Sequence, residues 1–385
     1  MNIGLSTTMI QRGRSGVAQY VLALVRALLA EGRAHRLHLF LFPEDRPLFE
    51  FAGDQVVRIP VPERFRAAVP NVWWHQANLP GLARRHRLDV LHIPSYRRLL
   101  WRKPCALVAT IHDLAPFQVA GKYDPARMFY GKVVVRRLAQ RQDEIIAVST
   151  NTARDIERFF AIPRTRQHVV LNGIDHGRFC PGDPGRARAQ AAACWNLRAP
   201  FFLYVSRLEH PAKNHVRLIE AFNAFKAATG SPWLLVLGGS DWHGAEIIHA
   251  AAQASAHREH IRFPGFVPDA DLPTLYRAAE AFVYPSLFEG FGFPPVEAMA
   301  CGCPVISSPR GSLDEVIADA AVRVDPENVQ ELTAVLRRVA TDEACRTGLV
   351  AAGLQNARRF DWRLNARGVL QVYDEAARRR SGVPS

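Results

Sequence analysis

Short apolar runs alternate with helical patterns along almost the whole chain. Runs rich in leucine and β-branched residues predict strands, and the longer segments between them, such as QYVLALVRALLAE, carry apolar residues at helical spacing. Alternation of this kind is typical of parallel sheets with helices on both faces. The sequence therefore predicts an open α/β architecture.

The predicted strands fall into two sets, and each set is large enough to form its own sheet. The first set lies around Ile3 and at 37–42, 90–93, 107–111, 144–148 and 169–171. The second set lies at 201–205, 234–237, 261–263, 281–284, 305–307 and 322–324. Because single cores rarely grow beyond about 250 to 300 residues, a chain of 385 residues also favours two domains.

The domain boundary is expected between the two sets of strands. The segment HGRFCPGDPGRARAQ holds turn-forming residues without an apolar period, so we place a hinge at 181–188 and the domains at 1–180 and 195–360. The final stretch, about 362–385, reads as an amphipathic helix with Leu364, Val369, Val372 and Tyr373 near one another. We expect this helix to pack on the first domain. Two facing domains would leave a cleft, and ligands of such folds bind beyond the carboxyl ends of the strands.

The first motif beyond a strand is the loop QRGRSG, with Gly13 and Gly16. Amides at the start of the helix that follows could hold an anion. The spacing differs from the dinucleotide fingerprint, and no acidic residue ends the next strand, which disfavours a nicotinamide cofactor. A purely structural turn remains the alternative.

In ATIHDLAPF, His112 and Asp113 follow a buried strand. A histidine at that place can donate a hydrogen bond to a hydroxyl or a phosphate, and Asp113 could fix its tautomer or cap the next turn. A capped turn with a satisfied histidine is the competing interpretation.

The segment YVSRLEHPAKNHVRLIEAF places Arg207 at the end of an apolar strand and Lys213 near the start of a helix. Two cations there match a diphosphate and would stabilise the charge that develops on a diphosphate leaving group. Two solvated cations are the alternative.

The stretch FEGFGFPPVEAMACGCPV places Glu289 in a loop and Glu297 in the first turns of a helix that opens with two prolines. Gly290 and Gly292 would let backbone amides approach a ligand, and each carboxylate can accept hydrogen bonds from a vicinal diol. Two other interpretations stay open. The glutamates could complement a helix dipole, or they could act as the acid and base of a glycosidase, which would give the two cations no role.

Taken together, these motifs resemble family four of the retaining glycosyltransferases, which have the GT-B fold of two facing Rossmann-like domains. The resemblance covers most of the chain and includes IHDLAPF, LNGID, YVSRLEHPAKN and PGFVPDADLPTLYRAA. Its most specific part is PSLFEGFGFPPVEAMACGCPVISS, whose two glutamates have the family's spacing.

The resemblance implies a role for each matching residue of the second domain. Glu289 and amides of Gly290, Phe291 and Gly292 would hold the donor sugar. Glu297 would hold the ribose of the nucleotide. Arg207 and Lys213 would bind the diphosphate, and the backbone around Phe266 and Val267 would read the base.

In the first domain, the resemblance implies that His112 contacts the transferred sugar and that the loop of Gly13 and Gly16 approaches the diphosphate. Arg14 departs from the family pattern, because a small or apolar residue is more usual there, and it could contact an acceptor phosphate. Asp113 is the second candidate for acceptor contact. The resemblance implies no cofactor and no obligatory metal.

The motifs look most like bacterial mannosyltransferases that build O-antigen or exopolysaccharide from GDP-mannose. The expected reaction is transfer of a sugar from a GDP- or UDP-linked donor to a glycan or lipid-diphosphate-linked acceptor, with retention of configuration. A sugar-nucleotide epimerase of similar fold is the alternative, since it would grip the same donor.

The charge adds a possible partner. Residues 1–185 hold 27 Lys and Arg against 15 Asp and Glu, a surplus of 12 out of the net charge of +13. Such a half could face nucleic acid, an anionic bilayer or a phosphorylated substrate, or simply be solvated. No aromatic and basic recognition motif supports a nucleic-acid-binding protein. The start, MNIGLSTTMI, lacks signal-peptide features, so we expect a cytoplasmic protein that could associate with the inner face of the plasma membrane.

Overall fold

The chain divides into two compact units. The computed structural model describes residues 1–13, 15–32, 34–118 and 130–381. The first unit comprises Met1–Gly173 and Asp361–Ser385, and the second comprises Ile174–Phe360. The predicted hinge at 181–188 is therefore wrong. Its proline and glycine residues begin a helix of the second unit instead, with Asp183 as the N-cap that accepts hydrogen bonds from two backbone amides.

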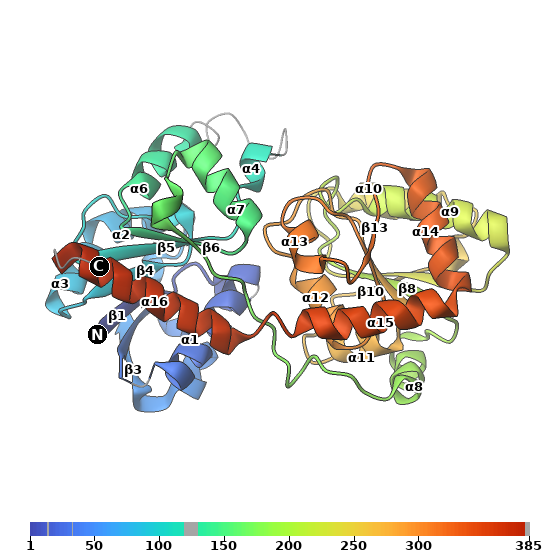
Figure 1. Cartoon of the computed structure of the whole chain (residues 1–385), viewed down its shortest axis with the longest axis horizontal. Coiled ribbons are helices and arrows are strands. Elements are labelled where there is room, and N and C mark those ends of the chain that lie inside the picture. Colours follow the sequence, from blue (N-terminus) through green and yellow to red (C-terminus); the bar gives the residue numbers. More distant parts are fainter. Residues whose placement is uncertain (14, 33, 119–129, 382–385) are drawn as a thin grey trace. The chain divides into compact units, whose positions relative to one another are not determined.

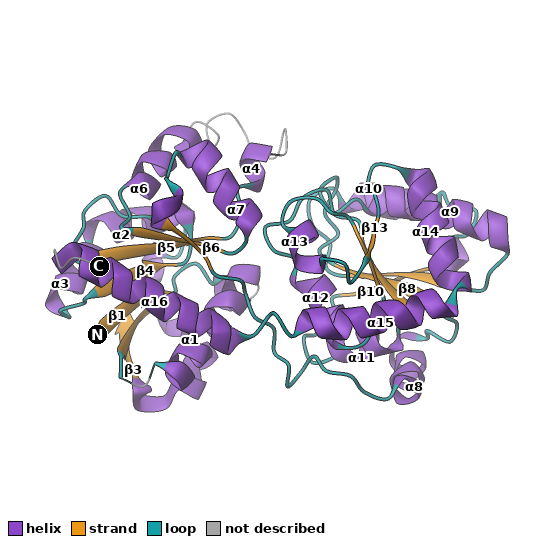
Figure 2. Cartoon of the chain, viewed as in Figure 1, coloured by secondary structure: helices purple, strands orange, loops and turns teal. Residues whose placement is uncertain are grey.

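The first unit is built on a parallel seven-stranded sheet with the order β3-β2-β1-β4-β5-β6-β7 (Figures 1 and 2). The strands are β1 Asn2–Ser6, β2 Arg36–Leu41, β3 Val56–Pro60, β4 Val90–Ile93, β5 Ala106–Ile111, β6 Glu144–Ala147 and β7 Gln167–Val169. The α-helices and π-helices are α1 Gly16–Glu31, α2 Ala68–Ala77, α3 Leu79–Arg85, α4 Ala115–Gln118, η5 Gly131–Val135, α6 Arg136–Gln140, α7 Thr150–Asp155, η6 Ile156–Phe160 and α16 Trp362–Ser381. Short 3₁₀ segments lie at Gln11–Gly13, Pro43–Gln55, Glu63–Phe65, Tyr96–Arg98 and Arg164–Arg166.

The second unit is built on a parallel six-stranded sheet with the order β10-β9-β8-β11-β12-β13. Its strands are β8 Phe201–Val205, β9 Leu234–Gly238, β10 Ile261–Gly265, β11 Ala281–Tyr284, β12 Val305–Ser307 and β13 Val322–Arg323. Its helices are α8 Pro184–Trp195, α9 His215–Thr229, α10 Ala245–Gln253, the 3₁₀ turn Arg258–His260, α11 Leu272–Ala278, α12 Phe293–Ala300, α13 Leu313–Ile317, α14 Val329–Thr341 and α15 Glu343–Ala357. Two Rossmann-like parallel sheets confirm the predicted fold class.

Alternating side chains explain why the sheet of the first unit is covered on both faces. Neighbouring residues of a strand point to opposite faces, so Ile145 and Ile146 of β6 enter two different cores. The core around Ile146 contains α1 and α16, whereas the core around Ile145 contains Trp74 of α2 and Phe160 of η6. The strands read as continuous apolar runs because both faces are buried.

The C-terminal helix α16 belongs to the core of the first unit and packs against α1, β4, β5 and β6. Val369, Val372 and Tyr373 are buried, as the predicted apolar face requires. Leu364 is 56% exposed, so its place on that face was wrong. Leu364 precedes Tyr373 by nine positions, about two and a half turns of an α-helix, so the two side chains lie on opposite sides of Trp362–Ser381 and Leu364 faces solvent.

The edges of the first sheet were the hardest part to predict. Strand β3 was missed because VVRIP has an arginine and a proline, which only an edge strand tolerates. Strand β7, at the other edge, lies two residues before the predicted run at 169–171. Among the described residues, no helix combines the length and apolar character needed to cross a bilayer.

Candidate functional site

Two loops beyond the carboxyl ends of β8 and β11 meet in the second unit. The amide of Leu287 donates to the carbonyl of Ala212 at 3.0 Å, and the side chain of Asn214 donates to the carbonyl of Pro285 at 3.1 Å. Tyr204 of β8 donates to the carbonyl of Lys213 at 2.7 Å. The segment with the two predicted cations is therefore fixed against the segment with the first glutamate.

Lys213 and Glu289 form the most enclosed ion pair of this region. Lys213 Nζ lies 2.5 Å from Glu289 Oε1, and each side chain is only 15% exposed. The hydroxyl of Tyr284 donates to the same carboxylate oxygen at 2.9 Å. Burial alone would raise the pKa of Glu289, but the charge of Lys213 and the hydrogen bonds from Lys213, Ser286 and Tyr284 together outweigh burial, so its pKa lies below the usual value. Glu289 is held as a carboxylate.

Glycines shape the loop around Glu289. Gly292 has φ +98°, and an added Cβ would lie 2.5 Å from Leu313. Gly311 has φ +65°, and its Cβ would lie 2.5 Å from the carbonyl oxygen of Glu289, which accepts a hydrogen bond from Ser312 at 3.0 Å. Glycine is thus needed at both positions, because a side chain at either one would collide with the loop that positions Glu289. Phe291 is buried and packs edge-on against Phe360, so its contribution to a ligand would come from its backbone.

Arg207 lies in the same connection as Lys213 but pairs elsewhere. Its Nη2 donates to Glu209 Oε2 at 2.9 Å, and its guanidinium lies 5.0 Å from the ring centre of Trp242. The side chain is 55% exposed, so this ion pair contributes little to stability. In the described structure, Arg207 and Lys213 share no hydrogen-bond partner. The sequence analysis did not identify Glu209, although it stands only two positions after Arg207.

Glu297 lies in the first turns of its helix, as predicted. It is the fifth residue of α12, where its carboxylate accepts a hydrogen bond from Tyr276 of α11 at 3.1 Å. Burial raises the pKa of Glu297 to about 7, although Arg178 and the Tyr276 hydroxyl act in the opposite direction. A carboxyl group beyond the first turn gains little from the helix dipole, so that alternative is disfavoured.

The predicted base-reading segment follows β10. Phe266 is 70% exposed, whereas Val267 is buried and its Cγ2 would lie 3.2 Å from a Cβ at Gly238. Gly239, with φ +149°, donates its amide to Gly265 at 2.8 Å. The backbone of this segment therefore lies beside the carboxyl end of β9.

In the first unit, the glycine loop leads into α1. Gly13 has φ +83°, and Ser15 caps the helix by accepting a hydrogen bond from Ala18 at 3.2 Å. Gly16 is the first helical residue, and open space surrounds the place where its Cβ would lie. Arg14 lies outside the described residues.

His112 directly follows β5, as predicted, but its hydrogen bonding differs from the expectation. Nε2 lies 3.2 Å from the carbonyl oxygen of Pro94, which can only accept, so that nitrogen carries the proton. Burial lowers the pKa of His112 to about 4, opposed by the charge of Asp113. The neutral ring therefore offers Nδ1 as an acceptor, which suits a hydroxyl and not a phosphate. Tyr20 packs edge-on against the ring, with centroids 4.7 Å apart.

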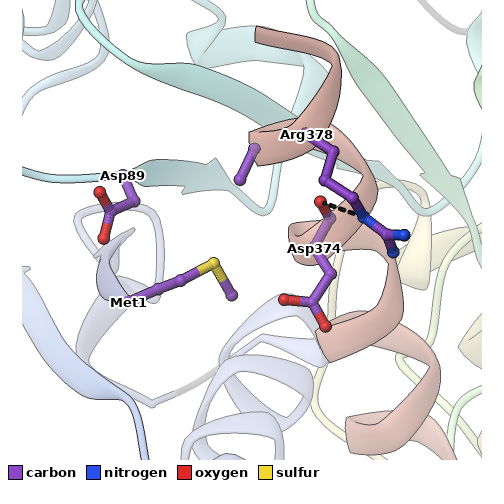
Figure 3. Close-up of a pocket in the computed structure, with 5 residues that line it drawn as sticks. Met1, Asp89, Asp374 and Arg378 are labelled. Carbon is purple, nitrogen blue, oxygen red and sulfur yellow. Dashed lines mark hydrogen bonds between the residues drawn. The ribbon is translucent and has the colours of Figure 1, made fainter. Parts of the chain in front are cut away.

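One pocket of the first unit lies at the amino ends of its strands, opposite to the ends that carry the motifs. It has a volume of about 620 Å³ and lies beside Met1, which precedes β1, and Asp89, which precedes β4 (Figure 3). Asp374 and Arg378 of α16 line its other side (Figure 3). Ligands of open α/β folds bind at the carboxyl ends of strands, so this pocket is no candidate for the site.

Two groups of side chains have the composition of a metal site. His257, Glu259 and His260 offer ligand atoms within 4.8 Å of one another, but they precede β10 and so lie at the amino edge of the sheet. Asp269 and Asp271 form a D-x-D pair in the turn before α11, where Asp269 lies 3.7 Å from Arg178. Neither group contacts the Lys213 and Glu289 pair in the described structure.

Comparisons with known proteins identify related families for both units. Residues 14–178 match the family model of Glycosyltransferase Family 4, and residues 187–356 match that of Glycosyl transferases group 1. The chain is 28% identical to O-antigen chain mannosyltransferase B of Escherichia coli over 94% of this chain and 96% of the relative. It is 32% identical to the serotype-specific mannosyltransferase WbdA of Escherichia coli over 67% of this chain, which spans 32% of that longer relative.

Solved structures show the same fold. Sucrose-phosphate synthase from Thermosynechococcus elongatus superposes with a TM-score of 0.78 at 21% identity, covering 97% of this chain and 98% of that structure. HepE of Anabaena, solved in complex with UDP and glucose, superposes with a TM-score of 0.75 at 18% identity over the full length of both chains.

The fold and the two family matches define a glycosyltransferase that uses a nucleotide sugar. The chain belongs to the GT-B glycosyltransferases, with family-four sequence features in its first unit and group-1 features in its second. This membership favours sugar transfer over the epimerase and nucleic-acid-binding alternatives.

The enclosed ion pair predicts a specific stability pattern. Lys213→Met leaves a buried carboxylate without its cation and is expected to lower the free energy of unfolding by roughly 3 kcal/mol at neutral pH. The double variant Lys213→Met/Glu289→Gln is expected to recover much of that loss. Urea unfolding measures both, and Arg207→Met is the exposed control, with an expected change within about 0.5 kcal/mol.

The same pair predicts a pH dependence. The pKa of Glu289 is lower in the folded than in the unfolded state, so its stabilisation is present above the ordinary value of 4.5 and is lost as the pH falls below it. The difference between wild type and Lys213→Met should therefore shrink at acid pH. Equal losses for Lys213→Met and Arg207→Met at neutral pH would contradict the assignment.

Proposed function

We propose that the chain transfers mannose from GDP-mannose to a hydroxyl of a glycan or lipid-diphosphate-linked glycan, with retention of configuration, in the synthesis of a bacterial surface polysaccharide. The observation that carries the proposal is the enclosed pair of Lys213 and Glu289 beyond the carboxyl ends of β8 and β11. Such a pair supplies a carboxylate for sugar hydroxyls next to a cation for phosphate. The mannosyltransferases of Escherichia coli among the relatives support mannose as the sugar.

Glu289 is proposed to bind the sugar and not to act as a nucleophile or base. Lys213 and Tyr284 donate to Oε1, and Ser286 also hydrogen-bonds to the carboxylate. Because a carboxylate has about four acceptor positions, it can still accept from a sugar hydroxyl. Its lowered pKa makes it a poor proton acceptor. Amides of Gly290, Phe291 and Gly292 are proposed to assist it.

Charge stabilisation on the leaving diphosphate is proposed to supply most of the catalysis. Lys213 would contact the diphosphate while it orients Glu289, and Arg207 would exchange Glu209 for a diphosphate oxygen. The bond between the anomeric carbon and the diphosphate breaks as the acceptor hydroxyl attacks from the same face. The departing diphosphate oxygen takes the acceptor's proton, so no covalent enzyme intermediate is required.

Glu297 is proposed to hold the ribose, with the base read by the backbone near Phe266 and Val267. An ionised Glu297 accepts from both ribose hydroxyls while Tyr276 donates to one of its oxygens. Because its pKa lies at about 7, this grip should strengthen as the pH rises through neutrality.

The roles proposed for the first unit follow from His112, Gly13 and Gly16. His112 would accept a hydrogen bond from a hydroxyl of the transferred sugar through Nδ1. The space beside Gly16 and the backbone turn at Gly13 would allow close approach of the diphosphate. Arg14 and Asp113 remain the proposed acceptor contacts. No metal or other cofactor is proposed to be required, so turnover should survive EDTA.

A thermal-shift panel of GDP, UDP, ADP and dTDP tests the donor. A ligand that binds only the folded state raises the melting temperature, and GDP is expected to raise it most. The GDP shift should grow between pH 6 and pH 8, because Glu297 ionises in about that range. A larger shift with UDP would overturn the proposed base, and no shift with any of the four would count against a nucleotide-sugar donor.

Arg207→Ala is expected to reduce turnover about 10²-fold with donor saturating, since it removes one cation from the leaving group. Its stability should change little because the side chain is half exposed. Steady-state kinetics with GDP-mannose and an acceptor glycan measures the effect. Arg337→Ala, on the exposed face of α14, serves as the matched control and should keep wild-type turnover. Wild-type turnover in Arg207→Ala would remove Arg207 from the catalytic machinery.

A further inference from the structure

Four polar side chains form a hydrogen-bonded network inside the apolar core of the first unit. The hydroxyl of Tyr373 lies 2.7 Å from Nδ1 of His92, and Nε2 of His92 lies 2.8 Å from Oγ1 of Thr110. The same Oγ1 lies 3.1 Å from the hydroxyl of Tyr20. Each of the four residues is at most 1% exposed. We call them the buried polar network, which joins α16, β4, β5 and α1 in that order.

The strands that carry the buried polar network are otherwise apolar. Alternate residues of a strand point to the same side, so His92 shares a face of the sheet with Val90. Thr110 shares that face with Val108. Helices α1 and α16 cover it and pack against each other (Figure 1). Because apolar groups of the same shape can replace both partners of a buried hydrogen bond without loss of stability, stability alone does not require polar residues here.

The histidine at the centre of the network couples its two hydrogen bonds. Burial lowers the pKa of His92 to about 3, so the ring is neutral and has one N–H donor and one acceptor nitrogen. One neighbouring hydroxyl therefore donates to the ring, while the other accepts from it. Networks whose members are all satisfied make the side chains that they join more rigid. The network thus fixes the hydroxyl end of Tyr20 in the core.

Tyr20 connects the network to the candidate site. Its hydroxyl is held by Thr110, and its ring packs edge-on against the ring of His112, with centroids 4.7 Å apart and an angle of 80° between the planes. His112 is held a second time where Nε2 donates to the carbonyl of Pro94. Two contacts from different elements therefore restrict rotation of the His112 ring and leave Nδ1 as its acceptor.

We propose that Tyr20 is a positioning residue for sugar transfer and that the buried polar network holds Tyr20 in place. The Tyr20 ring keeps His112 turned so that Nδ1 meets a hydroxyl of the transferred sugar. Orientation matters at this point, because a misplacement of about 1 Å near the reacting atoms can lower the rate about 10²-fold. The inference rests on the proposed function, in which His112 contacts the sugar. It gives α16 a role at the site through Tyr373.

Removal of single hydroxyl groups tests the network. Tyr373→Phe and Tyr20→Phe keep both aromatic rings and are expected to lower turnover roughly tenfold with GDP-mannose and an acceptor glycan saturating. The thermal shift with GDP should stay as in wild type, since neither hydroxyl belongs to the proposed nucleotide site. Val372→Ala is the control, because it removes buried packing from α16 without removing a hydrogen bond. It should lower the melting temperature and keep wild-type turnover.

A double-mutant cycle tests whether the network acts through His112. In the His112→Ala background, Tyr373→Phe should cause no further loss of turnover, whereas independent effects would add. NMR of protein labelled at histidine gives a readout that does not depend on activity. Wild type should show the Nε2–H tautomer of His112, assigned by its absence in His112→Ala. In Tyr20→Leu, which lacks the aromatic ring, this tautomer should no longer dominate.

Four results would contradict the proposal. These are wild-type turnover in both hydroxyl variants, an equal loss of turnover in Val372→Ala, a full further loss from Tyr373→Phe in the His112→Ala background, or an unchanged His112 tautomer in Tyr20→Leu. The NMR arm separates this proposal from the proposed function. A wild type that transfers no sugar from GDP-mannose, yet shows a tautomer that depends on Tyr20, supports the positioning of His112 and contradicts the proposed function alone.

Discussion

The buried ion pair between Lys213 and Glu289 is the contact on which the second unit's site depends. It joins the connection after β8 to the loop after β11, and the backbone bond from Leu287 to Ala212 supports it at the same junction. The desolvation cost of two buried opposite charges is offset only when the charges pair with each other. The pair also decides the chemistry, because a carboxylate that a lysine keeps ionised is suited to hold hydroxyls and unsuited to give or take protons.

The environments of the two glutamates separate their roles. Glu289 has a cation as its nearest partner and a lowered pKa, whereas Glu297 accepts a hydrogen bond from the Tyr276 hydroxyl and has a pKa raised to about 7. A glycosidase also needs one acidic and one basic carboxyl group, yet the family matches identify a transferase. In the transferase that we propose, the same difference would distinguish a sugar contact next to phosphate from a ribose contact that weakens in acid.

Much of the fold, and the positions of the candidate site residues just after strands, could be predicted from the sequence, because buried parallel strands read as apolar runs. Strand β3 could not, since an edge strand with arginine and proline has no such run. The hydrogen-bond partners of the site residues also could not be predicted from the sequence. Nothing in the local sequence shows that Tyr284 donates to Glu289 or that His112 donates to the carbonyl of Pro94. Those contacts depend on tertiary geometry.

We propose that Glu289 and Glu297 bind different ends of one donor. The most direct measurement compares turnover and nucleotide affinity in Glu289→Gln and Glu297→Ala. If the proposal is right, Glu289→Gln lowers turnover far more than nucleotide affinity, and Glu297→Ala chiefly lowers nucleotide affinity. The reverse pattern, with nucleotide binding lost in Glu289→Gln and turnover at saturating donor lost in Glu297→Ala, would contradict it.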